Sequence, residues 1–173
     1  MPHLESFLSE RQIQDRVAEL GAEVARDYGD EEIILVAILK GSIHFLADLS
    51  RKLGENVVID TMRVSSYGDA MESSGIVQIV KDIEVPIEGR HVLLVEDIVD
   101  TGATLAYLLE LLQTRRPKSL KVASLLSKPE ARKTDVPIAY LGFEIPNAFV
   151  VGYGLDYAER YRNLPYIAIY RES

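Results

Sequence analysis

The chain of 173 residues carries 27 Asp and Glu against 19 Lys and Arg, a net charge of −8, and contains no Cys and no Trp. That length is enough for one domain with a sizeable core, so we expect residues 1–173 to form a single domain. The absence of cysteine excludes disulfides, thiolate metal sites and cysteine nucleophiles.

The charge balance also limits the partners of the protein. A net charge of −8 disfavours general binding to nucleic acid or to an anionic membrane, but it leaves room for a local basic pocket that takes a small phosphorylated ligand. No apolar stretch reaches the ~18 residues of a membrane span, and the N-terminal residues show no signal-peptide pattern. We therefore expect a soluble protein of the cytoplasm.

In chain order, the first expected element is a helix over residues 9–28. Apolar residues recur there every three or four positions, and Ser9 and Gln12 match the capping-box pattern. The apolar run over residues 31–39 has no alternation, so it predicts a strand that is buried on both faces, as in a parallel sheet covered by helices. A second helix is expected over residues 43–53.

The same alternation of strand and helix continues toward the C-terminus. A buried strand is expected at residues 91–96, followed by a polar loop and a helix that runs from Leu105 to Leu112. Further strands are expected at residues 120–126, 138–143, 149–153 and 166–170. This order predicts an α/β fold with a doubly wound, mainly parallel sheet flanked by helices, whose ligands bind at the carboxyl ends of the strands.

Residues 57–80 depart from this pattern. Two β-rich runs, residues 57–64 and 75–80, are joined by a polar segment of small and turn-forming residues. They predict two antiparallel strands, and the joining residues 65–74 form a loop suited to act as a lid.

The segment VEDIVDTGAT, residues 95–104, is the most informative stretch for function. Two adjacent acids, Glu96 and Asp97, come at the carboxyl end of a buried strand, and a loop containing Asp100 and Thr101 leads into a helix. A phosphate at that helix start would meet free backbone N–H groups and the positive end of the helix dipole. The paired acids suit sugar hydroxyls or a hydrated Mg²⁺ instead. A helix cap with solvated acids is the alternative, but it accounts only for Asp100 and Thr101.

This segment resembles the phosphoribosyl-pyrophosphate motif of the type I phosphoribosyltransferases, in which hydrophobic residues and two acids precede a loop rich in Asp, Thr and Gly. Other phosphate motifs fit less well, because the chain lacks a P-loop and has no complete dinucleotide-binding glycine pattern. The resemblance implies that phosphoribosyl pyrophosphate is bound by Glu96, Asp97, Asp100, Thr101, Gly102, Ala103 and Thr104.

Three further segments narrow the resemblance to the hypoxanthine-guanine phosphoribosyltransferases. LKGS, residues 39–42, is similar to the pyrophosphate loop of that family, in which the Leu–Lys peptide is commonly cis. SLLSKPEAR, residues 124–132, and the long segment over residues 144–170 are similar to the parts that bind the purine and close the site. The matches run in the expected order and imply a phosphoribosyltransferase fold with a small hood and a mobile lid loop.

The resemblance also implies a role for each matched residue. Pyrophosphate would be bound by Lys40, Gly41 and Arg162. The purine or nucleotide would be bound by Lys128, Phe149, Val150, Leu155 and Asp156, with Lys128 donating to the 6-oxo oxygen and Phe149 stacking on the base. The metal ligands would be Glu96, Asp97 and Asp156. Ser66 and Tyr67 match the Ser-Tyr pair of the family's lid.

The implied reaction transfers 5-phosphoribose from 5-phosphoribosyl 1-pyrophosphate to N9 of hypoxanthine or guanine, forming IMP or GMP and pyrophosphate. Asp100 would be the catalytic base or proton acceptor at the purine N7. Lys128 would reject adenine, because an ammonium group only donates hydrogen bonds and cannot accept one from a 6-amino group. The expected cofactor is Mg²⁺, and the family's habit suggests a homo-dimer or homo-tetramer.

Three alternatives stay open at this point. The chain could be a nucleic-acid-binding regulator on the same fold, although its net charge of −8 and its lack of a basic run argue against one. A receiver-like signalling module would explain acids at strand ends but not the Thr/Gly loop or Lys128. A phosphoribosyltransferase for another base, such as xanthine, adenine or orotate, is the alternative within the same enzyme class.

Overall fold

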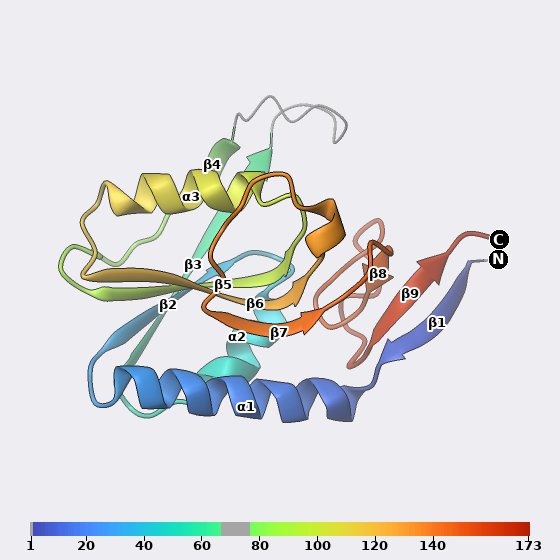
Figure 1. Ribbon diagram of the computed structural model, residues 1–173, viewed down its shortest axis with the longest axis horizontal. Coiled ribbons are helices and arrows are strands. Elements are labelled where there is room, and N and C mark those ends of the chain that lie inside the picture. Colours follow the sequence, from blue (N-terminus) through green and yellow to red (C-terminus); the bar gives the residue numbers. More distant parts are fainter. Residues whose placement is uncertain (1, 67–76) are drawn as a thin grey trace.

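The computed structural model describes residues 2–66 and 77–173 (Figure 1). Within these residues the main sheet contains β2 (Ile33–Ile38), β3 (Val57–Ser66), β4 (Val77–Lys81), β5 (His91–Val99), β6 (Ser119–Ser127) and β7 (Tyr140–Glu144). A smaller sheet contains β1 (His3–Leu8), β8 (Val150–Val151) and β9 (Ile167–Arg171). The helices are α1 (Glu10–Tyr28), α2 (Ile43–Ser50), α3 (Ala103–Gln113) and the 3₁₀ helix η1 (Pro129–Ala131).

The main sheet has the strand order β4-β3-β2-β5-β6-β7, and all neighbours pair in parallel except β3 and β4. Helix α3 covers one face, and α1 and α2 cover the other (Figure 1). This is the doubly wound, mainly parallel sheet that the sequence predicts. The chain order reverses between β2 and β5, and such a switch point is where open α/β sheets bind ligands.

Strand β2 shows why the central strands of this sheet are continuous apolar runs in the sequence. All six residues of β2 are buried. Leu35 and Ala37 belong to the core cluster shared with α1 and α2, whereas Ile34 and Val36 belong to the cluster shared with α3. Because both faces of β2 are covered, polar residues do not alternate with apolar ones along this strand. Burial of each of the larger side chains contributes about 1.5–3 kcal/mol to the stability of the fold.

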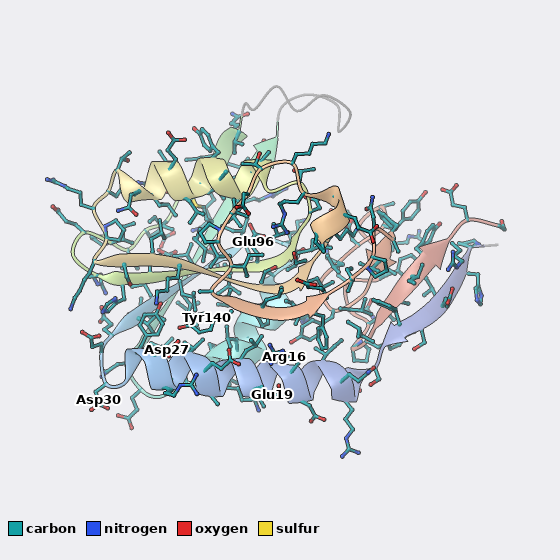
Figure 2. All side chains as sticks on the ribbon, viewed as in Figure 1. Arg16, Glu19, Asp27, Asp30, Glu96 and Tyr140 are labelled. Atoms are coloured by element: carbon teal, nitrogen blue, oxygen red, sulfur yellow. The ribbon has the colours of Figure 1, made fainter. Side chains whose placement is uncertain are left out.

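Helix α1 is fixed at both ends and along its length. The predicted capping box is present: Ser9 Oγ accepts from Gln12 N at 3.1 Å, and Gln12 Oε1 accepts from Ser9 N at 2.8 Å. Arg16 donates to the carbonyls of two residues of β7, at 2.7 and 2.9 Å, and the Tyr140 hydroxyl donates to Asp27 at 2.6 Å (Figure 2). These contacts occupy polar groups of an edge strand that would otherwise be open to pairing.

The smaller sheet differs from the sequence-based expectation. Strand β1, for which the sequence pattern predicts no element, pairs antiparallel with β9, and Arg171 donates to Glu5 at 2.6 Å. Strand β8 is two residues long, shorter than the predicted 149–153, because Gly152 and Tyr153 turn to positive φ values of 101° and 49°. None of the described helices is long and apolar enough to cross a membrane.

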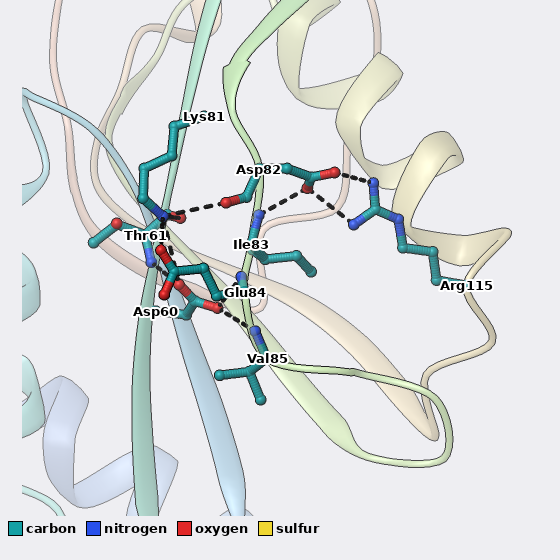
Figure 3. A network of polar contacts seen from close by, with 8 residues as sticks. All are labelled: Asp60, Thr61, Lys81, Asp82, Ile83, Glu84, Val85 and Arg115. Atoms are coloured by element: carbon teal, nitrogen blue, oxygen red, sulfur yellow. Dashed lines mark hydrogen bonds and ion pairs between the residues drawn. The ribbon is translucent and has the colours of Figure 1, made fainter.

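A network around Asp60 anchors the base of the β3–β4 hairpin (Figure 3). The carboxylate of Asp60 is 7% exposed and accepts the backbone N–H groups of Thr61, Glu84 and Val85 at 2.7–2.9 Å. Lys81 Nζ lies 3.8 Å from Asp60 Oδ1 and donates to the Thr61 carbonyl at 2.9 Å. Burial alone would raise the pKa of Asp60, but the three N–H donors and Lys81 outweigh it and lower that pKa.

The Asp60 network leads to a stability prediction. We expect Asp60→Asn to lower the free energy of unfolding at pH 7 by about 1–3 kcal/mol, because an amide is a weaker acceptor for three buried N–H donors. The folded-state pKa of Asp60 is lowered, so its contribution is complete above the unfolded-state pKa of about 3.9 and declines as the pH falls through that range. Urea unfolding between pH 3 and pH 8 measures this, with the exposed Asp30→Asn as control. A constant difference across that range would contradict it.

Candidate active site

The candidate site lies where β2 and β5 end side by side. These two strands pair in parallel, with Val36 opposite Leu94 and Ala37 opposite Val95. The residues that follow β2 and the last residues of β5 therefore reach the same edge of the sheet. A cavity of about 200 Å³ opens there, lined by Ile38, Glu96, Ile98, Val99, Asp100, Thr101, Gly102, Thr104 and Leu105.

The loop after β2 fits tightly against β5. The Leu39–Lys40 peptide is cis, as the resemblance implies. A Cβ atom on Gly41 would lie 1.8 Å from Asp97 Oδ2, so any side chain at this position would displace the carboxylate. Ser42 is fully buried, and its hydroxyl donates to the Ile38 carbonyl at 2.6 Å. The sequence LKGS thus places the backbone of Gly41 directly against the second acid of the site.

Of the two adjacent acids, Glu96 is buried and Asp97 is partly buried, and few donors compensate their charges. Glu96 is 8% exposed and lies between α3 and the sheet (Figure 2). Burial raises the pKa of Glu96, and the charges of Asp97 and Asp100 raise it further. Burial also raises the pKa of Asp97, although the N–H of Ile98, at 2.7 Å, and the charge of Arg162 act in the opposite direction. Buried carboxylates of like charge are unfavourable until a cation or several hydrogen-bond donors reach them.

This pair fits a hydrated divalent cation bound partly by substrate. Carboxylate oxygens are the ligands that Mg²⁺ prefers, and Mg²⁺ usually keeps waters and substrate oxygens in its shell. Among the described residues no group of three or more His, Asp or Glu side chains forms a complete metal site. Glu96 and Asp97 could therefore hold such an ion only together with other ligands.

The loop between β5 and α3 presents backbone N–H groups at the start of a helix. Gly102 is the N-terminal cap of α3 and has φ = 85°, a conformation that residues with a Cβ atom rarely adopt. A Cβ atom there would also lie 2.4 Å from the Thr134 carbonyl oxygen. The Thr101 hydroxyl accepts from Ala103 N at 3.4 Å. The free N–H groups of the first helical turn and the helix dipole make this loop suited to an anion.

The loop after β6 is joined to the loop after β5 by hydrogen bonds. Lys128 N donates to the Val99 carbonyl at 2.9 Å, and the N–H groups of Lys133 and Thr134 both donate to the Thr101 carbonyl at 2.9 Å. These bonds place the Lys128 side chain near Asp100. Burial lowers the pKa of Lys128, and the charge of Asp100 acts in the opposite direction. Lys128, the candidate residue for purine recognition, and Asp100, the candidate proton acceptor, thus lie near each other.

Arg132 strengthens this junction, and sequence reasoning assigned it no role. Its guanidinium donates to the Asp100 carbonyl at 3.0 Å, the Val99 carbonyl at 3.4 Å and the Ser127 hydroxyl at 2.6 Å. These contacts fix the backbone on which Asp100 and Lys128 stand. The segment SLLSKPEAR contains Arg132, but nothing in its pattern indicates which carbonyls the side chain would meet.

The third part of the site is the segment that follows β8. Val150 and Leu155 are buried at 5% and 8% exposure, and Val150 pairs with Ile169 of β9. Phe149 is 51% exposed, and its ring makes edge contacts with Tyr157 and with a tyrosine of β9, at 5.9 Å between centroids in each case. An exposed aromatic face of this kind is suited to stacking on a planar ligand.

The charged residues of this segment meet the loop after β2. Arg162 donates to the Gly154 carbonyl at 2.7 Å and lies 3.4 Å from Asp156. Glu159 pairs with Lys40 at 2.9 Å and with Arg162 at 3.1 Å. The structure therefore brings Lys40 and Arg162, which are distant in sequence, to one carboxylate. Sequence reasoning missed Glu159, because a single acid in a charged segment carries no signal of its own.

The structure gathers most of the sequence-predicted residues at one edge of the main sheet. Ser66 is the last residue of β3, which runs parallel to β2, and Tyr67 lies outside the described residues. Fold and site together define an α/β protein with two acids, a loop suited to an anion and a cationic pair at its switch point, an arrangement that suits a phosphorylated sugar ligand.

Comparison with known proteins identifies the family. The family model described as "Phosphoribosyl transferase domain" matches residues 3–158. The chain belongs to this family, as the sequence resemblance implies.

The chain is also similar to individual proteins of this family. It is 51% identical over 167 residues to the hypoxanthine-guanine phosphoribosyltransferase of Bacillus subtilis (strain 168), covering 96% of this chain and 93% of that protein. It is 52% identical to the enzyme of the same name from Mycobacterium avium, covering 93% and 82% of the two chains. A crystal structure of a hypoxanthine phosphoribosyltransferase from Staphylococcus aureus matches with a TM-score of 0.93 and 48% identity, over 96% of this chain and 91% of that one.

The buried acid pair leads to a second prediction. We expect Asp97→Asn to raise the free energy of unfolding at pH 8, without added metal, by about 1–2 kcal/mol, and to reduce activity strongly. The folded-state pKa of Asp97 is raised, so ionisation destabilises the fold as the pH rises above the unfolded-state value of about 3.9. The gain should therefore vanish near pH 3. Denaturant unfolding at both pH values measures it, with the exposed Asp15→Asn as control, and a less stable variant at pH 8 would contradict it.

Proposed function

We propose that this chain transfers 5-phosphoribose from 5-phosphoribosyl 1-pyrophosphate to N9 of hypoxanthine or guanine, as a purine salvage enzyme. The observation that carries this proposal is the arrangement at the switch point. Glu96 and Asp97 precede a loop suited to an anion, Lys128 lies near Asp100, the charge of Arg162 acts on Asp97, and Lys40 and Arg162 share the Glu159 carboxylate. The names of the relatives at about 50% identity support the same reaction.

Each part of the sugar substrate has a matching group in the site. The 5-phosphate would bind the loop formed by Thr101, Gly102, Ala103 and Thr104, where backbone N–H groups and the helix dipole favour an anion. Glu96 and Asp97 would accept hydrogen bonds from the ribose hydroxyls, which compensates their burial. The pyrophosphate would bind the Lys40 ammonium, the backbone of Gly41 and the Arg162 guanidinium. The acids, which would repel phosphate, thus face the uncharged part of the substrate.

The site works mainly by positioning and by stabilising charge. As the bond from the anomeric carbon to pyrophosphate breaks, positive charge develops on the ribose and negative charge on the leaving group. Lys40 and Arg162 stabilise the leaving group, and Glu96 and Asp97 hold the ring in place. Glu96 and Asp97 would hold Mg²⁺ together with substrate oxygens, and Asp156 would approach a second Mg²⁺. The chemistry that these ions supply when bound is neutralisation of the pyrophosphate charge.

Asp100 and Lys128 would act on the purine. The Asp100 carboxylate would accept a proton at N7, a contribution of about 10²–10⁴-fold for a positioned acid–base group. Lys128 would donate to the 6-oxo oxygen, while Phe149 stacks on the ring and the backbone of Val150 contacts the base edge beside Leu155. A 6-amino group would face the ammonium donors without an acceptor, so adenine should be rejected. Ser66 and Tyr67 would belong to a lid that limits the access of water.

The wider properties of the protein are part of the same proposal. We place residues 1–173 in a single phosphoribosyltransferase domain, located in the cytoplasm and assembled as a homo-dimer or homo-tetramer. Its partners would be small molecules, with no nucleic acid and no membrane. The net charge of −8 and the cysteine-free composition support this placement.

An absorbance assay tests the proposed reaction. The purified chain is given phosphoribosyl pyrophosphate and Mg²⁺ with hypoxanthine, guanine, xanthine or adenine in separate reactions. We expect rapid, Mg²⁺-dependent nucleotide formation from hypoxanthine or guanine and none from adenine. Turnover of xanthine alone would move the protein to a different base class, and no turnover by a folded sample would contradict the proposal.

A lysine substitution tests the proposed base recognition. We expect Lys128→Gln to lower kcat/KM for hypoxanthine by about 10–100-fold and to narrow the preference over adenine, because the glutamine amide can both donate and accept. Thermal unfolding should change little, since Lys128 is bound to the fold through its backbone N–H. The matched control is Lys121→Gln, near the opposite end of β6. An unchanged ratio of hypoxanthine to adenine use would refute this role.

A further inference from the structure

Glu159 occupies a place that neither the family motifs nor the mechanism above explains. Its two carboxylate oxygens bind different cations: Oε2 lies 2.9 Å from Lys40 Nζ, and Oε1 lies 3.1 Å from an Arg162 guanidinium nitrogen. One carboxylate thus bridges two cations, each through its own oxygen. Two adjacent oxygens of a phosphate group would make the same contacts.

The stability of the fold does not account for this bridge. The Glu159 side chain is 64% exposed and that of Lys40 is 46% exposed, and an ion pair this open to water contributes at most about 1 kcal/mol. The turn that carries Glu159 is itself strained, because Ala158, Glu159 and Tyr161 have φ values of 51°, 67° and 75°. Such backbone costs of order 1 kcal/mol or more for each residue, and it is typical of functional sites.

Local contacts fix the turn so that the carboxylate is aimed at the site. Asp156 accepts the backbone N–H of Glu159 at 2.9 Å, and Arg162 is held by the Gly154 carbonyl at 2.7 Å. Within the described residues, Arg162 Nε is buried without a hydrogen-bond partner. The bridge therefore leaves one buried donor of the guanidinium unsatisfied, and a ligand with more oxygens could satisfy it.

From this geometry we propose that Glu159 is an internal anion that occupies the Lys40–Arg162 pair in the free enzyme and is exchanged for pyrophosphate. The inference rests on the proposed function, which assigns pyrophosphate to these two cations. While the site is free, Glu159 keeps the two cations together. When pyrophosphate binds, the carboxylate must leave both of them, and its charge then opposes the ligand at close range.

This exchange has a direct consequence for affinity. Every pyrophosphate that binds must displace the carboxylate, so Glu159 weakens pyrophosphate binding and favours its release. The same competition applies to the pyrophosphate group of phosphoribosyl pyrophosphate. It does not apply to the purine, which the proposed function assigns to Lys128 and Phe149. Glu159 is in these terms a residue that sets the affinity for one substrate and one product.

The test is the binding of inorganic pyrophosphate, with Mg²⁺, to the full chain and to Glu159→Gln, measured by calorimetry and by inhibition of the reaction. Glutamine keeps the size of the side chain and the backbone contact to Asp156 but lacks the charge. We expect pyrophosphate to bind about 3- to 10-fold more tightly to Glu159→Gln, the range expected for loss of one exposed competing charge. The KM for phosphoribosyl pyrophosphate should fall in the same direction, and the KM for hypoxanthine should not change.

Two further variants separate this effect from simpler ones. Glu88→Gln removes a charge from another exposed pair, at 3.2 Å from Arg116, and controls for the change in net charge. Glu159→Asp keeps the charge on a shorter stem that cannot span both cations, so its pyrophosphate affinity should lie between those of the parent and Glu159→Gln. Thermal unfolding establishes that each variant is folded.

The outcomes distinguish this inference from the proposed function. Equal or weaker pyrophosphate binding by Glu159→Gln, with the parent binding normally, would overturn the exchange. Equal tightening in Glu88→Gln would also overturn it, because net charge alone would then explain the result. If the parent chain neither binds pyrophosphate nor forms a nucleotide, the proposed function itself fails.

Discussion

The parallel pairing of β2 with β5 is the interaction on which the rest of the structure depends. It lies at the centre of the main sheet, where side chains from both helical layers bury the two strands. Since the chain order reverses between these two strands, the loops that follow them leave the sheet side by side and in opposite directions. The loop after β2 and the last residues of β5 meet for this reason, and the missing side chain of Gly41 lets the Asp97 carboxylate fill the space between them.

The acids at this edge show a conflict between stability and function. Glu96 and Asp97 are adjacent, alike in charge and shielded from water wholly or in part, so the fold would be more favourable with neutral residues there. Active sites often hold such groups, because a ligand that supplies donors or a cation then gains from compensating them. Asp60 makes the useful contrast: it is as little exposed as Glu96, but three backbone N–H groups compensate its charge.

The site is assembled from three loops that are bound to one another as well as to the sheet. Thr101 accepts two backbone N–H groups from the loop after β6, and Arg132 donates to the Val99 and Asp100 carbonyls on one side of this junction and to the Ser127 hydroxyl on the other. Glu159 joins the third loop to the first through Lys40. The three loops are thereby coupled through short, direct contacts, so that a displacement of one loop changes the contacts of the other two.

The sequence by itself determined the class of fold and most of the candidate site. Local patterns predict the continuous apolar strands, the helices and the capping box at Ser9. The motif over residues 95–104 indicates its chemistry because its acids and its anion-binding loop are consecutive in the sequence. Tertiary structure alone decided the rest. The pairing of β1 with β9, the carbonyls that Arg132 contacts and the bridge made by Glu159 join residues that are up to 168 positions apart. Such contacts depend on how the loops meet after the sheet has formed. The hydrophobic periodicity of the sequence does not predict them, because each involves a single side chain or an exposed strand with little apolar pattern.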